Sequence, residues 1–114
     1  MARTPKRLVG PALIATGPTT VYTVPAVTKT ILREIHISNP SGSPVTFTLS
    51  IGADAAATRL WSAYSIPAAA AGVTDSVRDI FVYIPMEAAE ILTLSAGTNN
   101  ILDITITGDE LTLG

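Results

Sequence analysis

Val45-Thr46-Phe47-Thr48-Leu49-Ser50-Ile51 alternates apolar and hydroxylated residues without a break. Because successive side chains of an extended chain point to opposite faces, this stretch places four apolar side chains on one face and three hydroxyls on the other. Such a pattern is typical of a strand that buries one face against a core and leaves the other face to solvent. The stretch therefore predicts an antiparallel sheet that is packed on one side.

The preceding segment, residues 30–39, alternates in the same way. Its isoleucines Ile31, Ile35 and Ile37 share one face, and the opposite face carries Leu32, Glu34, His36 and Ser38. The connector to Val45–Ile51 is Asn39-Pro40-Ser41-Gly42-Ser43-Pro44, and it consists of common turn formers. We therefore predict that the two segments pair as an antiparallel hairpin.

Further short segments have the composition of strands, and each is bounded by Gly, Pro, Asn or Asp. They are residues 8–15, 19–24, 59–64, 77–84, 90–95 and 101–107, with a short terminal addition at 111–113. This succession of short strands without an amphipathic helix indicates an all-β fold, an antiparallel β-sandwich or jelly roll. The length of 114 residues suits one domain. We assign residues 19–114 to this β-sandwich domain and residues 1–18 to an extended N-terminal arm.

The composition excludes several kinds of partner. Hydrophobic residues make up 47% of the chain, charged residues 14%, and mean hydropathy is +0.44, so we expect neighbouring subunits to cover part of the apolar surface. A net charge of −2 leaves no basic field that could hold nucleic acid. The uncharged residues 8–28 contain three prolines and two glycines, so we predict no membrane span. The absence of cysteine excludes disulfides and thiolate ligands.

Charge is divided between the two ends of the chain. The first 33 residues contain five Lys or Arg and no carboxylate, whereas the residues after Arg78 contain six carboxylates and no Lys or Arg. One interpretation of Arg3, Lys6 and Arg7 is a frayed terminus. The other is an arm that lies along a neighbouring subunit, whose acidic half offers Glu87, Glu90, Asp103, Asp109 and Glu110. On the second interpretation the three basic residues bind a partner.

Few residues could carry chemistry. His36 is the only histidine and has no metal-ligand spacing around it, so we interpret it as a surface or interface residue beside Glu34. The chain has no Gly-x-Ser-x-Gly motif and no phosphate-binding glycine loop. Two carboxylate pairs could bind calcium or support acid–base catalysis, but they resemble solvated strand ends: Asp75 with Asp79, and Asp109 with Glu110. We predict no enzyme activity, catalytic residue, metal or cofactor.

Trp61 is the single tryptophan and lies between Arg59 and Tyr64. A lone tryptophan commonly anchors the core, or the centre of a subunit interface where its ring is buried. A third interpretation is a platform on which a sugar ring stacks. We name Trp61 as a candidate partner-binding residue, with core packing as the alternative.

Two blocks of the chain combine strands and turns in a recognisable order. The first contains Val21-Tyr22-Thr23-Val24-Pro25-Ala26, then Thr30-Ile31-Leu32-Arg33-Glu34-Ile35-His36-Ile37-Ser38-Asn39-Pro40-Ser41-Gly42, then Val45-Thr46-Phe47-Thr48-Leu49-Ser50-Ile51-Gly52. The second is Ala96-Gly97-Thr98-Asn99-Asn100-Ile101-Leu102-Asp103-Ile104-Thr105-Ile106-Thr107-Gly108-Asp109-Glu110. Over residues 20–110 this pattern resembles small β-sandwich virion structural proteins of tailed bacteriophages, of the head decoration or cement type.

The resemblance implies a subunit that binds the outer surface of the phage head and stabilises the shell by bridging major capsid subunits. It implies self-association as a homotrimer, synthesis in the host bacterial cytoplasm and a final location on the virion. The chain has no heptads, no Gly-X-Y period and no fibrous repeat, which favours the head over a fibre. The alternatives are a phage tail, baseplate or fibre component, and a carbohydrate-binding module that uses Trp61.

Overall fold

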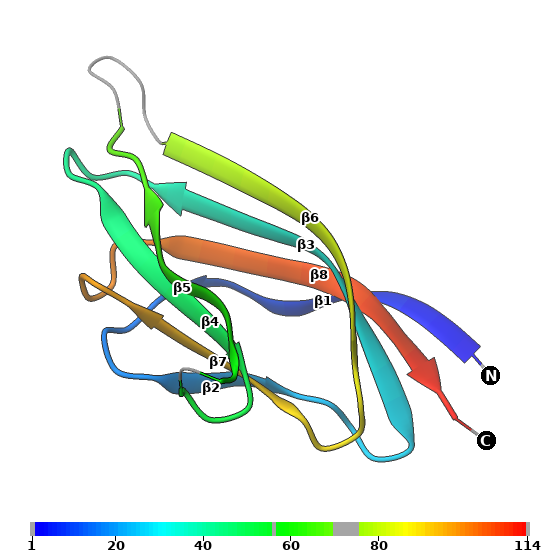
Figure 1. Ribbon diagram of the computed structural model, residues 1–114. Helices are drawn as coiled ribbons and strands as arrows, with labels where there is room; N and C mark the ends of the chain where they lie inside the picture. The colour runs from blue at the N-terminus through cyan, green and yellow to red at the C-terminus, as the bar shows by residue number, and fades with distance from the viewer. Residues whose placement is uncertain (1, 56, 70–75, 114) are drawn as a thin grey trace.

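The computed structural model describes residues 2–55, 57–69 and 76–113, which form eight β-strands (Figure 1). The strands are β1 (Ala2–Leu13), β2 (Thr19–Thr23), β3 (Thr28–Asn39), β4 (Val45–Ile51), β5 (Arg59–Ile66), β6 (Ser76–Met86), β7 (Ile91–Ala96) and β8 (Asp103–Thr112). Over these described ranges there is no helix, and hence none that is long and apolar enough to cross a membrane.

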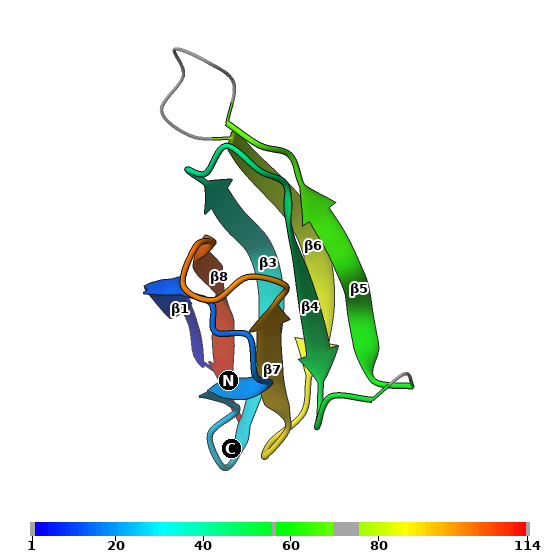
Figure 2. The same cartoon turned by 90° about the vertical axis from the view of Figure 1, so that its left-hand side faces the viewer.

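The strands form two four-stranded sheets in which every neighbouring pair is antiparallel. Sheet A has the order β1-β8-β3-β6, and sheet B has the order β2-β7-β4-β5. Among these pairs, β1 lies beside β8, β2 beside β7, β3 beside β6 and β4 beside β5, so the second half of the chain runs back along the first. This is the pairing of an eight-stranded jelly roll, and it confirms the predicted all-β antiparallel sandwich (Figure 2).

The core lies between the two sheets and follows from the alternation of side chains. In β4, Val45, Phe47 and Leu49 are buried in the core cluster, whereas Thr46 and Thr48 remain partly exposed. The other fully buried side chains of the cluster include Leu32, Ile35, Ile37, Ile66, Met86, Leu92, Leu94, Leu102, Ile104 and Ile106. Since each such side chain contributes about 1.5–3 kcal/mol when buried, this cluster is the main stabilising element.

The predicted hairpin between residues 30–39 and Val45–Ile51 is wrong. β3 belongs to sheet A and β4 to sheet B, so the connector between them crosses from one layer to the other. The buried side chain of Asn39 holds this crossing, because its amide Nδ2 donates to the carbonyl oxygens of Ser43, Ile66 and Pro67. Alternation shows that a strand buries one face, but it does not show which sheet the strand joins.

The predicted faces of β3 are also corrected. Two steps along β3, from Leu32 to Glu34, correspond to one step along β8, so Arg33 is an extra residue in the strand. Such a bulge exchanges the faces of the residues on either side of it. Leu32 therefore joins Ile35 in the core cluster, while Ile31 is buried outside that cluster.

The extended N-terminal arm predicted for residues 1–18 is not confirmed. Residues 2–13 form β1, which pairs with β8 along its length and is an edge strand of sheet A. Leu8 and Val9 of β1 are buried in the core. The prolines and basic residues of this segment lower its strand propensity, but Arg3 and Lys6 gain acidic partners on β8, as described below. The predicted terminal addition at 111–113 is largely a continuation of β8, which runs to Thr112.

Candidate interaction surface

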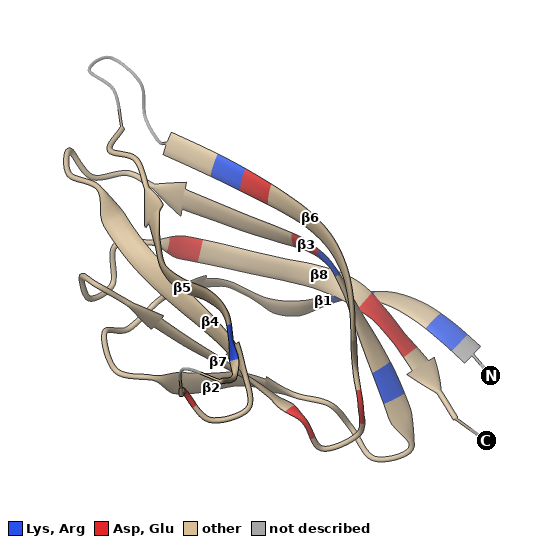
Figure 3. Cartoon of the chain, in the orientation of Figure 1, with Lys and Arg blue, Asp and Glu red and all other residues tan. Residues whose placement is uncertain are grey.

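Asp109 of β8 is the centre of a charged cluster on sheet A. Its Oδ2 accepts from Arg3 Nε at 3.0 Å and Nη2 at 2.6 Å, and from Arg33 Nη1 at 3.0 Å. The Arg3 guanidinium lowers the pKa of the Asp109 carboxyl, and Arg33 adds to this effect. The bulge in β3 positions Arg33, which reaches Asp109 across the sheet. Figure 3 shows the basic segments of β1 and β3 beside the acidic end of β8.

Glu110 forms a second polar contact, and this one joins the two sheets. Its Oε1 accepts from Lys6 Nζ at 3.2 Å, and its Oε2 accepts from the phenol of Tyr22 on β2 at 2.5 Å. The same phenol lies 2.8 Å from the Thr30 hydroxyl on β3. Burial, together with the hydrogen bond to Glu110, raises the pKa of Tyr22 to about 12. Tyr22 thus stays neutral, and its hydroxyl links β2 of sheet B to β3 and β8 of sheet A by hydrogen bonds.

These contacts change the interpretation of the predicted partner-binding residues. Arg3 and Lys6 were expected to meet the acidic half of a neighbouring subunit, but they meet Asp109 and Glu110 of their own chain. Arg7 is exposed on β1 opposite Thr107, and it forms no ion pair with any residue of the described ranges. Of the three residues, Arg7 therefore has its charge available for another molecule.

An apolar surface lies over β6. We call the outward side chains Val77, Asp79, Phe81, Tyr83 and Pro85 the β6 face. Its three large apolar members are well exposed: Val77 by 51%, Phe81 by 75% and Tyr83 by 67%. The Arg33 guanidinium lies 5.6 Å from the centre of the Tyr83 ring, a cation–π contact that orders one end of the face.

The sequence did not identify this surface, because residues 80–84 are all apolar. Ile-Phe-Val-Tyr-Ile has no polar alternation that separates an outward face from an inward one. A continuous apolar run of this kind indicates a strand that is buried on both faces, so no local pattern marked the exposed face.

His36 and Asp79 form a cross-strand pair between β3 and β6, with 2.5 Å between His36 Nδ1 and Asp79 Oδ1. Glu34 is close by, and one ligand atom from each of the three residues lies within 4.8 Å of the others. The His36 hydrogen bond lowers the pKa of the Asp79 carboxyl. In the described ranges these are the residues that could hold a metal ion, although the hydrogen bond between His36 and Asp79 already accounts for the proximity of those two. Asp75, predicted to accompany Asp79, lies outside the described residues.

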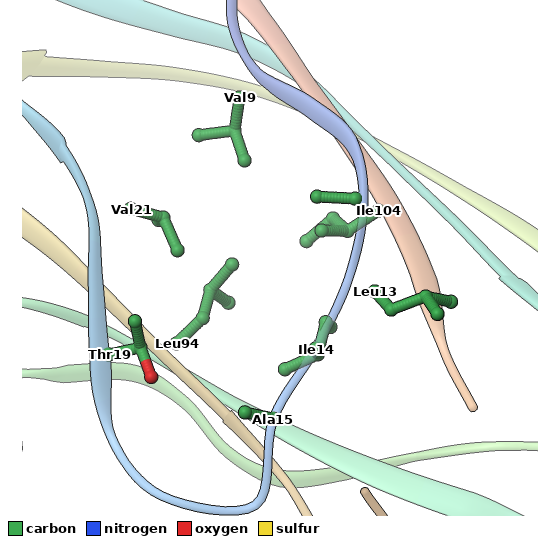
Figure 4. A pocket seen from close by; sticks show the side chains of 9 residues that line it. Val9, Leu13, Ile14, Ala15, Thr19, Val21, Leu94 and Ile104 are labelled. Atoms are coloured by element: carbon green, nitrogen blue, oxygen red, sulfur yellow. The ribbon is translucent and has the colours of Figure 1, made fainter. Parts of the chain in front are cut away.

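An apolar cavity of about 70 Å³ lies between β1 and β2 (Figure 4). Its lining includes Val9, Leu13, Ile14, Val21, Leu94 and Ile104, and Thr19 provides the one hydroxyl. A cavity of about 150 Å³ can hold a benzene ring and typical ligand sites are larger still, so this cavity is smaller than a typical ligand site. No titratable group lines it, and it offers no arrangement for catalysis.

Trp61 lies on β5 opposite Leu49 and is partly buried against the core cluster. Its sequence neighbour Arg59 is directed to Asp54, with Nε–Oδ1 and Nη2–Oδ2 distances of 2.9 and 3.2 Å. Trp61 therefore has a packing role, and part of its surface remains accessible.

Comparison with known proteins identifies no family for the chain. No protein-family model matches it, and no curated protein matches it. Among solved structures, a chain in the structure of infectious bursal disease virus Gt strain has a TM-score of 0.29 and 11% sequence identity. The likeness covers 96% of this chain but only 28% of that viral chain. A TM-score of 0.29 is too low to bear on the function.

Proposed function

We propose that this chain is a bacteriophage capsid decoration protein that binds the outer surface of the head and bridges major capsid subunits. The observation that carries the proposal is the β6 face, where Phe81 and Tyr83 are 75% and 67% exposed at neighbouring outward positions of one strand. Exposed aromatic patches of this kind mark surfaces that another protein covers. The resemblance of residues 20–110 to phage decoration proteins supplies the class of partner.

The remaining features fit a binding scaffold better than a catalyst. The cavity between β1 and β2 has no titratable lining, and His36, the only base of its kind, is paired with Asp79. Because Arg3 and Lys6 are engaged within the chain, we assign the shell contact to the β6 face and to Arg7. Self-association and a location on the head surface are part of the same proposal.

The mechanism is mass action. A protein that binds the assembled shell, and not its dissociated subunits, shifts the equilibrium toward the shell. When its free concentration is a hundred times its dissociation constant, the gain is about 2.7 kcal/mol for each bound copy. Many copies on one shell multiply this gain, so a modest affinity is sufficient.

The test is co-sedimentation of the purified chain with expanded heads that were assembled without it. We expect saturable binding and heads that resist heat longer when the chain is bound. The double variant Phe81→Ser, Tyr83→Ser should bind at least tenfold more weakly, because aromatic anchors commonly contribute about 2 kcal/mol each at an interface.

Val27→Asn is the matched control, because Val27 is 59% exposed in the turn before β3 and lies outside the β6 face. Its binding should equal that of the unsubstituted chain. Failure of the unsubstituted chain to bind heads would exclude a decoration protein. Recovery of the chain with purified tails instead of heads would establish the tail alternative.

A further inference from the structure

Three of the four edge strands in the described part of the chain carry features that discourage pairing with another molecule. β1 contains Pro5 and Pro11, three basic side chains and two register shifts. β2 is only five residues long. β5 has two register shifts against β4 and a left-handed residue, Ala63, with a φ of 50°. Natural sheets protect their edges with short strands, prolines, basic residues and bulges of this kind.

The fourth edge strand, β6, is different. It has 11 residues, its only charges are Arg78 and Asp79, and its one proline, Pro85, is next to its last residue, so the central residues 80–84 are apolar without Gly or Pro. Residues 76–81 pair regularly with β3, and exposure alternates from Asp79 to Met86 despite one register shift. Even the inward side chains of Ile80 and Ile84 stay partly exposed at this edge. A long apolar strand with an open edge is a template for a further strand.

We propose that β6 pairs with β6 of a second copy about a two-fold axis at Phe81, which joins two A sheets into one continuous sheet. Phe81 is the middle residue of Ser76–Met86, so an antiparallel pairing centred there overlaps the whole strand with its counterpart. A two-fold axis makes the contact self-complementary, because every contact between two residues is repeated with the roles of the two copies exchanged.

The side chains of the β6 face are complementary in this register. Phe81 lies opposite Phe81 of the second copy, Val77 opposite Pro85, and Asp79 opposite Tyr83. The Tyr83 phenol can donate to the Asp79 carboxylate, which has acceptor positions beyond the one used by His36. Registers centred on Arg78 or Asp79 would instead place like charges directly opposite each other, which is unfavourable. The pairing also brings two β6 faces together into one larger apolar surface.

The size of the contact sets its affinity. Phe81 and Tyr83 together expose roughly 250–300 Å² for each copy, if a full aromatic side chain presents about 200 Å². Stable complexes bury about 800 Å² per partner, so side chains and strand edge together form a small interface. We expect a dimer with a micromolar dissociation constant.

The experiment is sedimentation equilibrium of the purified chain over a concentration series. The mass should rise from 11.8 kDa to twice that value. Phe81→Lys and Phe81→Glu should each weaken the dimer at least tenfold, since each places two like charges opposite one another at the axis. An equimolar mixture of the two variants should restore a dimer, detected as a heterodimer by native mass spectrometry, because opposite charges then meet.

Thr20→Lys and Thr20→Glu are the matched controls, since Thr20 is exposed on the edge strand β2 and these variants have the same net charges as the Phe81 pair. They should dimerise like the unsubstituted chain. A chain that stays monomeric at all concentrations would overturn the inference. So would a mass three times 11.8 kDa, which is the trimer implied by the resemblance, or a mixture that fails to restore the dimer. No capsid is present in this test, so its outcome is independent of shell binding.

Discussion

Replacing Asn39 with alanine removes the side chain that holds the crossing between the two sheets. Its Nδ2 donates to the carbonyl oxygens of Ser43, Ile66 and Pro67 at 2.9, 3.2 and 3.1 Å, and its Oδ1 accepts from the backbone N–H and hydroxyl of Ser41 at 3.0 and 2.8 Å. These bonds tie the connector after β3 to the end of β5. The substitution therefore weakens both elements at once.

The expected loss follows from the groups that lose their partners. An amide side chain has two N–H groups and one oxygen, and each contributes about 1 kcal/mol net when hydrogen-bonded. The bond to Ile66 is buried, so its carbonyl is left without that donor, which costs about 1 kcal/mol more. We expect Asn39→Ala to lose about 3–4 kcal/mol of unfolding free energy. At about 4 °C per kcal/mol, the melting temperature should fall by about 12–16 °C.

Urea unfolding followed by the fluorescence of Trp61, which is partly buried, measures this loss. Asn99→Ala is the control, because Asn99 is exposed and accepts one bond from Thr16 N at 3.2 Å. It should lose less than about 1 kcal/mol. A loss below about 1 kcal/mol in Asn39→Ala would show that the crossing does not depend on this side chain, and the argument would be wrong.

Three further predictions can be checked in the same unfolding assay. Gly108→Ala should prevent normal folding, because the added Cβ would lie 2.1 Å from the Ile31 carbonyl oxygen. Gly42→Ala is the control and should be neutral, since a Cβ at that position has nothing within 4 Å. Equal stability of the two variants would contradict this prediction. Val27→Asn should stabilise the fold by about 1 kcal/mol, because Val27 has a φ of 55°, where asparagine is tolerated better than a β-branched residue. A loss of stability would show that the backbone at Val27 is not strained. Arg3 lowers the pKa of Asp109 in the folded state. The ionised Asp109 therefore stabilises the fold fully above the pKa of an unfolded aspartate, about 4, and this contribution is lost as pH falls through the lower pKa of the folded state. Asp109→Asn should therefore lose less unfolding free energy over that acidic range than the unsubstituted chain does. An equal loss in the two proteins would show that the charged cluster around Asp109 does not stabilise the fold.

The sequence predicted the strands well because strand formation depends on a local period of two. The structure has strands at all eight main predicted positions, although β1 begins at residue 2 instead of 8 and β8 runs to residue 112 instead of 107. The partners of the strands were not predictable in the same way. The pairing of β1 with β8 joins Arg3 to Asp109, which are 106 residues apart, and no local pattern records such a contact.

The candidate interaction surface was also predictable only in part from the sequence. The basic residues were recognised from their segregation, but charge composition does not distinguish an acidic partner in the same chain from one in a neighbour. Asp79 was recognised as an acid, yet its pairing with His36 depends on the β3–β6 register. The exposure of Phe81 and Tyr83 depends on which face of β6 turns away from the core, and the pairing of β6 with β3 sets this, not the segment itself.

The nested pairing of the strands also sets an order in which the jelly roll can close. Only residues 52–58 separate β4 from β5, whereas residues 14–102 separate β1 from β8. Loop closure over the longer span costs about 2 kcal/mol more, so the hypothesis is that pairing starts at β4–β5 and proceeds outward like a zipper. Pulsed hydrogen exchange during refolding would record this as early protection of β4 and late protection of β1, and the reverse order would exclude it. The strand that carries Arg3 and Lys6 would then be the last to pair, and its ion pairs would form on a sandwich whose other strands are already in place.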